Sequence, residues 1–327
     1  MLDQRRESVL QVLVAEYIRS GEPVSSRSIA ESAVLGVSSA TIRNDLVQLE
    51  QAGYIAQVHT SSGRIPTERG LRYFVDHSDP VRLQAATRER IHSFFGTVHH
   101  ELRQLLRATS EFLSDLTAYP ALVMGPQLAS EVIKGVQFIR LSTNTVLLVV
   151  VSSAGGVRQE LIRFDQPVED QPLDSIEAEL RRDLIGVPFD QAAARLRPDG
   201  EEASAISRAL ESVFEPTQEA ELFVGGAHQL THLWEDLSQV ERILHLLEQG
   251  EALAQLVESA AAEGTTVLIG SELGVGDVDD LAIISAGYGR EQGAHGRVAV
   301  LGPTRMNYPR AISVVEQVGE GLSSSLP

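Results

Sequence analysis

The hydrophobic positions of the first 77 residues predict three helices followed by a hairpin. Apolar residues at helical spacing from Leu10 to Tyr17 form the first helix, which Gly21 and Pro23 end. A short second helix runs to about residue 33, and a serine caps a third over residues 40–52. Weakly alternating residues, a Ser-Ser-Gly turn and a return strand then predict a hairpin, followed by a helix to about residue 77.

A long helix is predicted next, from about residue 81 to 116, because its apolar residues alternate at spacings of four and three. Such a seam packs either against the helix's own domain or against a second copy, as in a coiled coil. Both options stay open, since one position is threonine and the flanking charges have no regular pattern. The seam consists of Ile91, Phe95, Val98, Leu102, Leu105, Thr109, Phe112 and Leu116.

The remaining pattern predicts a β-meander placed inside a separate α/β unit. The meander has three strands, at 135–141, 145–152 and 157–164, and helices follow it to about residue 216. The surrounding unit has strands near 121–124, 222–224, 266–269, 281–285 and 298–301, a long helix over about 227–263, and a short terminal helix from Tyr308. The glycines from Gly287 to Gly296 predict a mobile hairpin between the last two strands.

These elements predict an α+β protein with three domains. A winged helix-turn-helix would occupy residues 1–78, the α/β unit residues 79–127 with 222–327, and the inserted domain residues 128–221. The chain has 327 residues, 43% of them hydrophobic and none of them cysteine, so disulfides, thiolate nucleophiles and cysteine-ligated metals are excluded. The lack of cysteine and of a long apolar run predicts a cytoplasmic protein with no membrane span.

The charge is divided unevenly along the chain. The formal net charge is −18, but residues 1–77 hold 8 arginines against 9 acidic residues and therefore carry only −1. The rest of the chain carries −17 and should repel polyanions. Any contact with nucleic acid is therefore expected from the N-terminal segment.

The third helix has the surface of a DNA-reading helix. Ile42, Leu46 and Leu49 lie on one face, while the opposite face is small and polar and its one acid, Asp45, sits nearer the core. Small residues permit close approach to a major groove, and Asn, Gln and Arg can read base edges. The alternative is an amphipathic helix in a generic three-helix core. The candidate DNA contacts here are Ser38, Ser39, Thr41, Arg43, Asn44 and Gln48.

The hairpin tip adds a second set of candidate DNA contacts. His59, Thr60, Ser61 and Arg64 supply hydroxyls and one fixed cation directly after the recognition helix, which is the order of a winged helix. Taken singly, His59 is a solvated loop residue and Arg64 a surface ion-pair partner. Together with the helix they favour contact with double-stranded DNA.

Two long motifs at opposite ends of the chain resemble the HrcA family of heat-inducible transcription repressors. They are VSSATIRNDLVQLEQAGYI with HTSSGRIPTERGLRYFVD near the start and GRVAVLGPTRMNYPRAISVVEQV at 296–318. The strings LIGSEL and IISAGYG lie where the family has its last core strands. The segment GAHQLTHLWED at 226–236 departs from the family's pattern, which puts local packing or a partner surface in doubt.

The resemblance implies a homodimer that represses chaperone operons by occupying an inverted-repeat operator called CIRCE. It implies a GAF-like fold for the α/β unit, a dimerising role for the insertion, and a GroEL-type chaperonin as a partner. Neither catalysis nor a cofactor is expected, since the sequence has no Walker A or Rossmann motif. The alternative is a winged-helix regulator that responds to a metabolite bound in the α/β unit.

Other candidate sites are weaker. His228 and His232 have a chelating spacing but no third ligand, and the acidic residues from Glu272 to Asp280 lack an EF-hand spacing. A helix face for the two histidines and a solvated loop for the acidic residues are the favoured interpretations over a metal site. The string from Gly302 to Pro309 is either a structural turn or an element that signals between domains.

Overall fold

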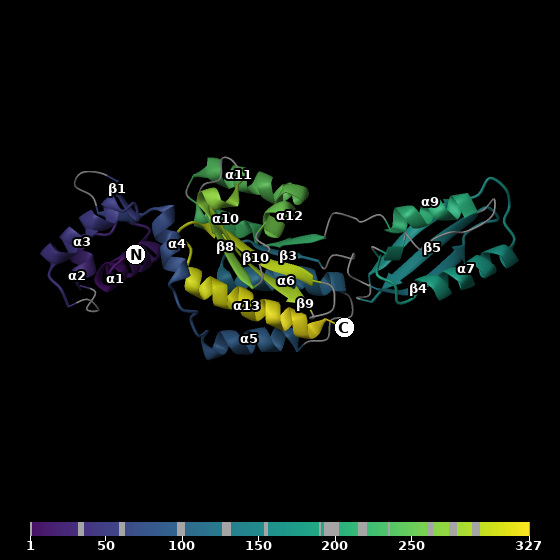
Figure 1. The fold of residues 1–327 in the computed structure, drawn as a ribbon, viewed down its shortest axis with the longest axis horizontal. Helices are drawn as coiled ribbons and strands as arrows, with labels where there is room; N and C mark the ends of the chain where they lie inside the picture. The colour runs from purple at the N-terminus through teal and green to yellow at the C-terminus, as the bar shows by residue number, and fades with distance from the viewer. Residues whose placement is uncertain are drawn as a thin grey trace.

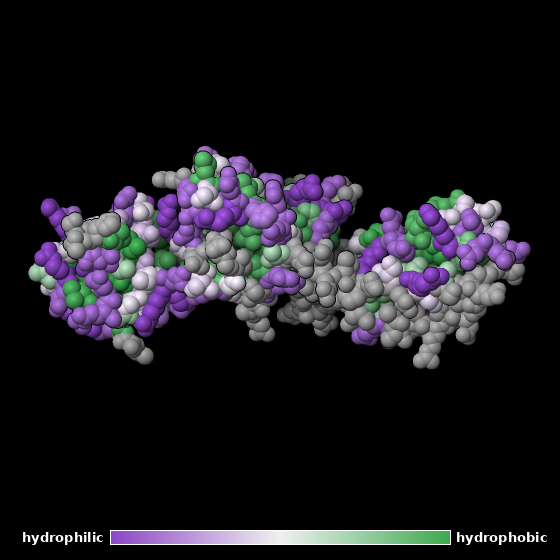
Figure 2. Space-filling view, turned by 90° about the horizontal axis from the view of Figure 1, so that it is seen from above, coloured by the Kyte–Doolittle hydropathy of each residue, from purple (hydrophilic) through white to green (hydrophobic). Residues whose placement is uncertain are grey.

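The chain forms three lobes in a row (Figure 1): an N-terminal domain, a central domain around the largest sheet, and an inserted domain at the far end. Figure 2 shows the same row from above, with hydrophilic residues over much of the visible surface and hydrophobic ones in patches between them. The computed structural model describes residues 2–31, 36–58, 63–96, 102–125, 132–153, 156–189, 191–192, 203–214, 221–234, 236–259, 264–274, 280–289 and 295–326.

The N-terminal domain packs four helices around a small hairpin. Its elements are α1 (Gln4–Ser20), α2 (Ser26–Glu31), α3 (Ser39–Gln51), β1 (Ile55–Gln57), β2 (Arg64–Pro66) and α4 (Glu68–Asp76). The strands β1 and β2 are antiparallel, with Ala56 opposite Ile65. Val24 pairs with Arg64 through two backbone hydrogen bonds of 2.8 Å, so the segment before α2 extends this small sheet.

The central domain is built on a five-stranded sheet in the order β7-β3-β10-β9-β8, in which all neighbours are antiparallel. The strands are β3 (Ala121–Met124), β7 (Leu222–Gly225), β8 (Thr265–Ile269), β9 (Leu281–Gly289) and β10 (His295–Pro303). The helices are α5 (Ala85–Phe95), α6 (Leu102–Thr117), α10 (Leu230–Leu233), α11 (Leu237–Glu248), α12 (Gly250–Ser259) and α13 (Tyr308–Ser325), with the 3₁₀ turns η2 (Ala227–Gln229) and η3 (Gly270–Leu273).

Helices cover both faces of this sheet. Alternate residues of each strand face α5, α6 and α13 on one side and α10 to α12 on the other, as the near-continuous burial of β9 requires. The first of these cores continues into the N-terminal domain: Leu71 and Phe74 of α4 belong to the same buried cluster as Tyr308 and Val315 of α13. The two domains therefore share one hydrophobic core.

Both predicted long helices are wrong in their length. The stretch from residue 81 contains α5 and α6 as separate helices, and α5 ends at Phe95 with Gly96 as its C-cap. The stretch from residue 227 is divided into η2, α10, α11 and α12, because Asp236 begins α11 as its cap, accepting the N–H of Ser238 at 2.9 Å. Of the predicted seam, Ile91, Leu105 and Leu116 are buried within the central domain; Val98 lies outside the described residues.

The predicted hairpin between the last two strands is present, since β9 and β10 are antiparallel neighbours, and its mobility stays a prediction. The strands β9 and β10 pair as far as Gly289 and His295, so Gly287, Gly289 and Gly296 are strand residues. Gly296 lies opposite Tyr288, whose hydroxyl donates to the Met124 carbonyl at 2.8 Å. A Cβ atom at position 296 would lie 2.3 Å from that hydroxyl, so the glycine makes room for the tyrosine. Residues 290–294 lie outside the described part. The predicted short terminal helix, in turn, is α13, with 18 residues.

The chain between β3 and β7 forms the inserted domain. Its antiparallel sheet, in the order β4-β5-β6, matches the predicted meander. One sheet face packs on two helices through Val136, Leu148, Val150 and Ile162. The elements are β4 (Ile133–Arg140), β5 (Thr145–Ser152), β6 (Val157–Arg163), α7 (Asp170–Leu184) and α9 (Ala203–Phe214).

Among the described residues, no helix has the length and hydropathy needed to cross a membrane.

Candidate nucleic-acid interface

Helix α3 is fixed at its start and along its inner face. The Ser38 hydroxyl accepts the N–H of Thr41 at 3.2 Å, which satisfies one of the free donors of the first turn. The inner face is formed by Ile42, Leu46 and Leu49, all buried. These contacts fix the rotation of the helix about its axis and therefore decide which side chains point outward.

The outward face of α3 carries the six candidate contacts predicted for this helix. The side chains of Arg43, Asn44 and Gln48 are exposed, and Arg43 forms no ion pair with any described residue. Ser39 is half-buried, with its hydroxyl 3.4 Å from that of Ser26 in α2. The structure thus brings together one hydrogen-bonding face, consisting of Ser38, Ser39, Thr41, Arg43, Asn44 and Gln48.

This face has the chemistry that a major groove requires. Asn and Gln side chains can form paired hydrogen bonds with adenine, and Arg with guanine. Ala40 is exposed between them and leaves room for close approach, while the Asp45 carboxylate, which would repel phosphates, is turned into the domain with 1% exposure. Among the described residues, this exposed polar face with a buried acid is found on α3, which lies at one end of the molecule (Figure 1).

The wing differs from its prediction in one respect. Arg64 is not a free cation: its Nε donates to Glu50 Oε2 at 3.0 Å, and its side chain is only 18% exposed. The pair ties β2 to the end of α3, so Arg64 holds the base of the wing. The ion-pair interpretation of Arg64 therefore fits the structure better than a direct phosphate contact. His59, Thr60 and Ser61 lie outside the described residues.

A cluster around Asp45 is the part of the site that sequence reasoning missed. Arg5 Nε and Nη2 donate to its two carboxylate oxygens at 2.8 and 2.9 Å, and Arg6 Nε lies 3.7 Å from Oδ1. The hydrogen bonds to Asp45 raise the pKa of Arg5. This bidentate pair ties the start of α1 to the inner side of α3. The partners are 40 positions apart in the sequence, so no local pattern predicts the pair.

Replacing Asp45 by asparagine is expected to destabilise the N-terminal domain by about 1–3 kcal/mol, because the buried site loses the charge that Arg5 and Arg6 share. Urea unfolding followed by circular dichroism measures this. The control is Glu31→Gln, which removes the exposed partner of Arg27 and should leave the transition midpoint unchanged. Equal effects of the two variants would contradict the role of the buried pair.

Comparison with known proteins agrees with this geometry. Residues 13–65, from the middle of α1 through β2, match the model of a DeoR-like helix-turn-helix domain. Residues 103–312 match the model described as HrcA protein C terminal domain.

Relatives match over almost the whole chain. The heat-inducible transcription repressor HrcA of Bacillus pumilus is 34% identical over 338 residues, covering 100% of this chain and 98% of that protein. The chain belongs to the HrcA family. The repressor of the same name from Mycobacterium leprae strain Br4923 is 37% identical, covering 97% and 96%. A crystal structure of a hypothetical protein at 2.2 Å resolution has 27% identity and a TM-score of 0.65, covering 99% and 98%. The resemblance and the predicted α+β class with an N-terminal helix-turn-helix are thereby confirmed.

The closing string of the HrcA pattern, residues 302–309, forms the turn from β10 to α13. Asn307 caps the helix, accepting the N–H of Arg310 at 3.4 Å. Tyr308 is fully buried and donates its hydroxyl hydrogen to the Thr304 carbonyl at 2.7 Å. Burial raises the pKa of Tyr308, so it remains the protonated donor. These contacts explain the string as a structural turn.

The segment that departs from the HrcA pattern, residues 226–236, contributes to the core of the central domain. Leu230 and Trp234 are buried in the cluster beneath α11 and α12. His228 and His232 are exposed on this segment. In the part of the chain that the structure describes, no three histidine or acidic residues lie close enough together to hold a metal ion.

The acidic loop of this HrcA chain was predicted to be solvated, and Glu272 is exposed but not free. Its carboxylate forms an ion pair with Arg72 of α4. Burial opposes its ionisation, but hydrogen bonds from Arg72 and from the N–H of Ile269 outweigh that effect and hold the pKa of Glu272 below its ordinary value. Asp277 and Asp279 lie outside the described residues.

Proposed function

We propose that this protein represses heat-shock gene transcription by occupying operator DNA with α3 in the major groove. The proposal rests on the exposed polar face of α3 around Asn44. Of the two acids of this helix, Asp45 is buried and paired with Arg5, and Glu50 is paired with Arg64. Membership of the HrcA family supports the class of gene, because the relatives are named heat-inducible transcription repressors. Repression by occupancy requires no catalysis, and the site of action is the bacterial chromosome in the cytoplasm.

We infer further that two copies bind one inverted-repeat operator of the CIRCE type. One winged helix buries too little surface for tight specific binding, whereas two linked copies combine their binding energies. Three residues of the predicted coiled-coil-like seam are buried within the central domain: Ile91, Leu105 and Leu116. This leaves the inserted domain as the better support for the dimer.

The outer face of the inserted sheet has the composition of an interface. Along β5, Leu147, Val149 and Val151 alternate with the buried residues and point away from α7 and α9. Their register partners on that face include Ile139 and Leu161, each 41% exposed, and Val157, 60% exposed. Exposed apolar residues gathered on one sheet face mark a contact with a partner, and we assign this face to a second copy.

A charge on this face should separate the dimer. Leu161→Asp is expected to shift the protein from dimer to monomer at micromolar concentration in sedimentation velocity, because the carboxylate would be desolvated in the contact. The matched control is Leu237→Asp, at a leucine of α11 in the central domain that is 75% exposed. A monomer produced by the control, with Leu161→Asp still dimeric, would move the interface to the central domain.

Two finer features rest mainly on the family resemblance. A GAF-like fold for the central domain is supported by its five antiparallel strands between two layers of helices. A GroEL-type chaperonin as a partner is supported by the resemblance alone. Added chaperonin with ATP should then restore operator binding after a heat pulse.

The test of the function is a fluorescence anisotropy titration of the full chain. The labelled duplex carries the upstream region of a chaperone operon from the same genome, and a shuffled duplex of equal composition is the reference. We expect strong preference for the first duplex at growth temperature and its loss across the heat-shock range, without added ligand. Equal affinity for both duplexes would refute the repressor proposal. A loss that requires a metabolite would favour the metabolite-responsive regulator.

A further inference from the structure

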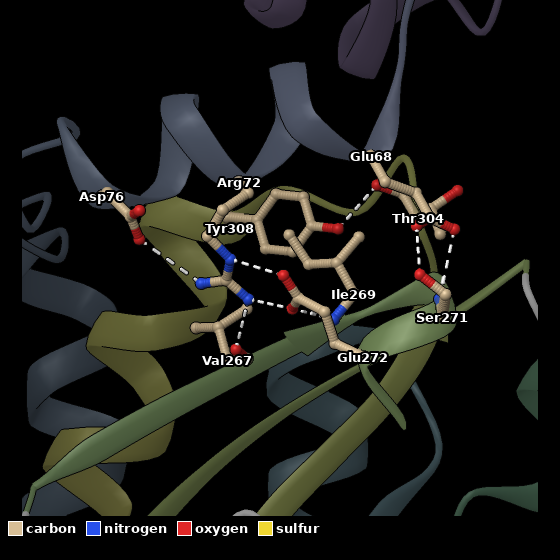
Figure 3. Close-up of polar contacts among 9 residues, drawn as sticks. All are labelled: Glu68, Arg72, Asp76, Val267, Ile269, Ser271, Glu272, Thr304 and Tyr308. Atoms are coloured by element: carbon tan, nitrogen blue, oxygen red, sulfur yellow. Dashed lines mark hydrogen bonds and ion pairs between the residues drawn. The ribbon is translucent and has the colours of Figure 1, made fainter. Parts of the chain in front are cut away.

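The N-terminal and central domains meet along α4, and Figure 3 shows the polar side of this joint. Arg72 Nε donates to Glu272 Oε1 at 2.9 Å, and its Nη2 contacts Glu272 Oε2 and donates to the Val267 carbonyl at 2.6 Å. The Arg72 and Glu272 side chains are 28% and 35% exposed, and the hydrogen bond to Glu272 raises the pKa of Arg72. One guanidinium thus connects α4 to both β8 and η3.

A second contact lies one helical turn earlier on α4. Glu68 accepts the N–H of Ser271 at 3.1 Å and the Ser271 hydroxyl at 2.5 Å. Positions 68 and 72 share one face of the helix, and their partners are adjacent residues of η3. A slip of α4 by one turn, about 5.4 Å, would bring Glu68 toward Glu272 and oppose two carboxylates. The charges of Glu68, Arg72 and Glu272 therefore favour a single register of α4 against η3.

The apolar side of the joint lies beneath these polar contacts. Leu71 and Phe74 on α4 are buried together with Val267 and Tyr308 of the central domain. At the end of α1 the domains also approach closely: a Cβ atom added to Gly21 would lie 3.2 Å from Arg305 Nη1.

Helix α4 is in turn tied to the recognition helix. Arg69 Nη1 donates to the carbonyl of Ala52 at the end of α3 at 2.8 Å. The Thr67 hydroxyl donates to the carbonyl of Gly53 at 2.7 Å, and the Thr67 N–H donates to that of Tyr54 at 3.0 Å. Any rotation of α4 on the central domain would therefore carry α3 with it.

We propose that Arg72 and Glu272, supported by Glu68 and Ser271, position the recognition helix for the operator. The pair fixes the angle of each N-terminal domain on its central domain, and so the separation of the two α3 helices in the dimer. The inference rests on the proposed function, since a set separation matters only when two half-sites are bound. Arg72 is a positioning residue and contacts no DNA.

The first test measures the joint without DNA. The chain has no cysteine, so Gln51→Cys and Leu237→Cys place two spin labels uniquely, on exposed positions of α3 and α11. Labelled protein diluted with unlabelled protein should give a narrow distance distribution by pulsed electron paramagnetic resonance. Glu272→Gln should broaden it. The control is Asp76→Asn, which removes an Arg72 contact of 3.4 Å within α4 and should leave the distribution unchanged.

The second test measures the consequence for the operator. Glu272→Gln should weaken binding to the complete inverted repeat on the order of tenfold, while affinity for a single half-site stays as in the parent protein. Arg72→Gln should do the same, and the double variant should lose no more than either single one, because the pair acts as a unit. Asp76→Asn should bind both duplexes like the parent.

The outcomes separate the two proposals. An unchanged distance distribution in Glu272→Gln overturns the positioning role, whatever the DNA results. Equal losses on the half-site and the repeat also overturn it, because they would show an effect within the N-terminal domain. A parent protein that prefers neither duplex refutes the proposed function, and the distance measurement still decides whether Glu272 holds the joint.

Discussion

Replacing Asn44 by alanine is expected to weaken operator binding by about 1–3 kcal/mol, roughly 5- to 150-fold, and to leave binding to random DNA unchanged. The reason is that Asn44 lies exposed at the centre of the outward face of α3, where its amide can both donate to and accept from a base edge. Contacts with phosphates, which sustain non-specific binding, would remain. Anisotropy titrations on the operator and on a shuffled duplex measure both quantities.

Gln51→Ala serves as the control for Asn44→Ala. Gln51 is an exposed amide two turns further along α3, away from the N-terminal part that enters the groove in helix-turn-helix proteins. It should change operator affinity much less. If Asn44→Ala weakens operator and random DNA equally, then Asn44 does not read bases.

Replacing Gly70 by alanine is expected to destabilise the N-terminal domain by about 1–3 kcal/mol or more. A Cβ atom at this position of α4 would lie 2.1 Å from the carbonyl oxygen of Tyr54, so helix and wing base would have to separate. That movement would also break the bond from Thr67 to the same carbonyl. Thermal unfolding followed by circular dichroism measures the change.

The matched control for Gly70→Ala is Gly250→Ala. Gly250 begins α12, and an added Cβ atom there meets no atom within 4 Å. Alanine favours the helix over glycine by roughly 0.5–1 kcal/mol, so this variant should be neutral or slightly more stable. Similar losses in both variants would show that the close contact of α4 with the wing is not what requires a glycine.

The recognition helix could be predicted from sequence because its signals are local. Ser38 stands directly before the apolar positions Ile42, Leu46 and Leu49, and the spacing of these three fixes which side is buried. The exposed set around Asn44 follows from that spacing. The strands of the inserted meander were equally accessible, since the β-branched run of β5 is bounded in the sequence by the turn residues Asn144 and Gly155-Gly156.

Helix breaks were missed because apolar spacing alone continues across them. Residues before and after Gly96 keep the same period, although α5 ends there. At Asp236 the capping side chain was present in the sequence, but the apolar pattern outweighed it. Among the glycines near the end of the chain, Gly296 makes room for the Tyr288 ring on the neighbouring strand, a role that the sequence does not reveal.

The ion pairs that shape the site could not be predicted at all. Arg5 and Asp45 are 40 residues apart, and Arg72 and Glu272 are 200 apart. Such pairs follow from the packing of whole domains, and no local periodicity marks them. The same holds for Arg64. Its position in the wing predicts a phosphate contact, but in the structure it forms an ion pair with Glu50.

A DNase footprint of the full chain is the direct test of operator occupancy through α3. The DNA is the upstream region of the chaperone operons in the protein's own genome, probed at growth temperature with the parent protein and with Asn44→Ala at equal concentration. We expect two protected half-sites related by twofold symmetry for the parent, and loss of that protection for Asn44→Ala. No protection by the folded parent, or protection that Asn44→Ala leaves intact, would contradict it.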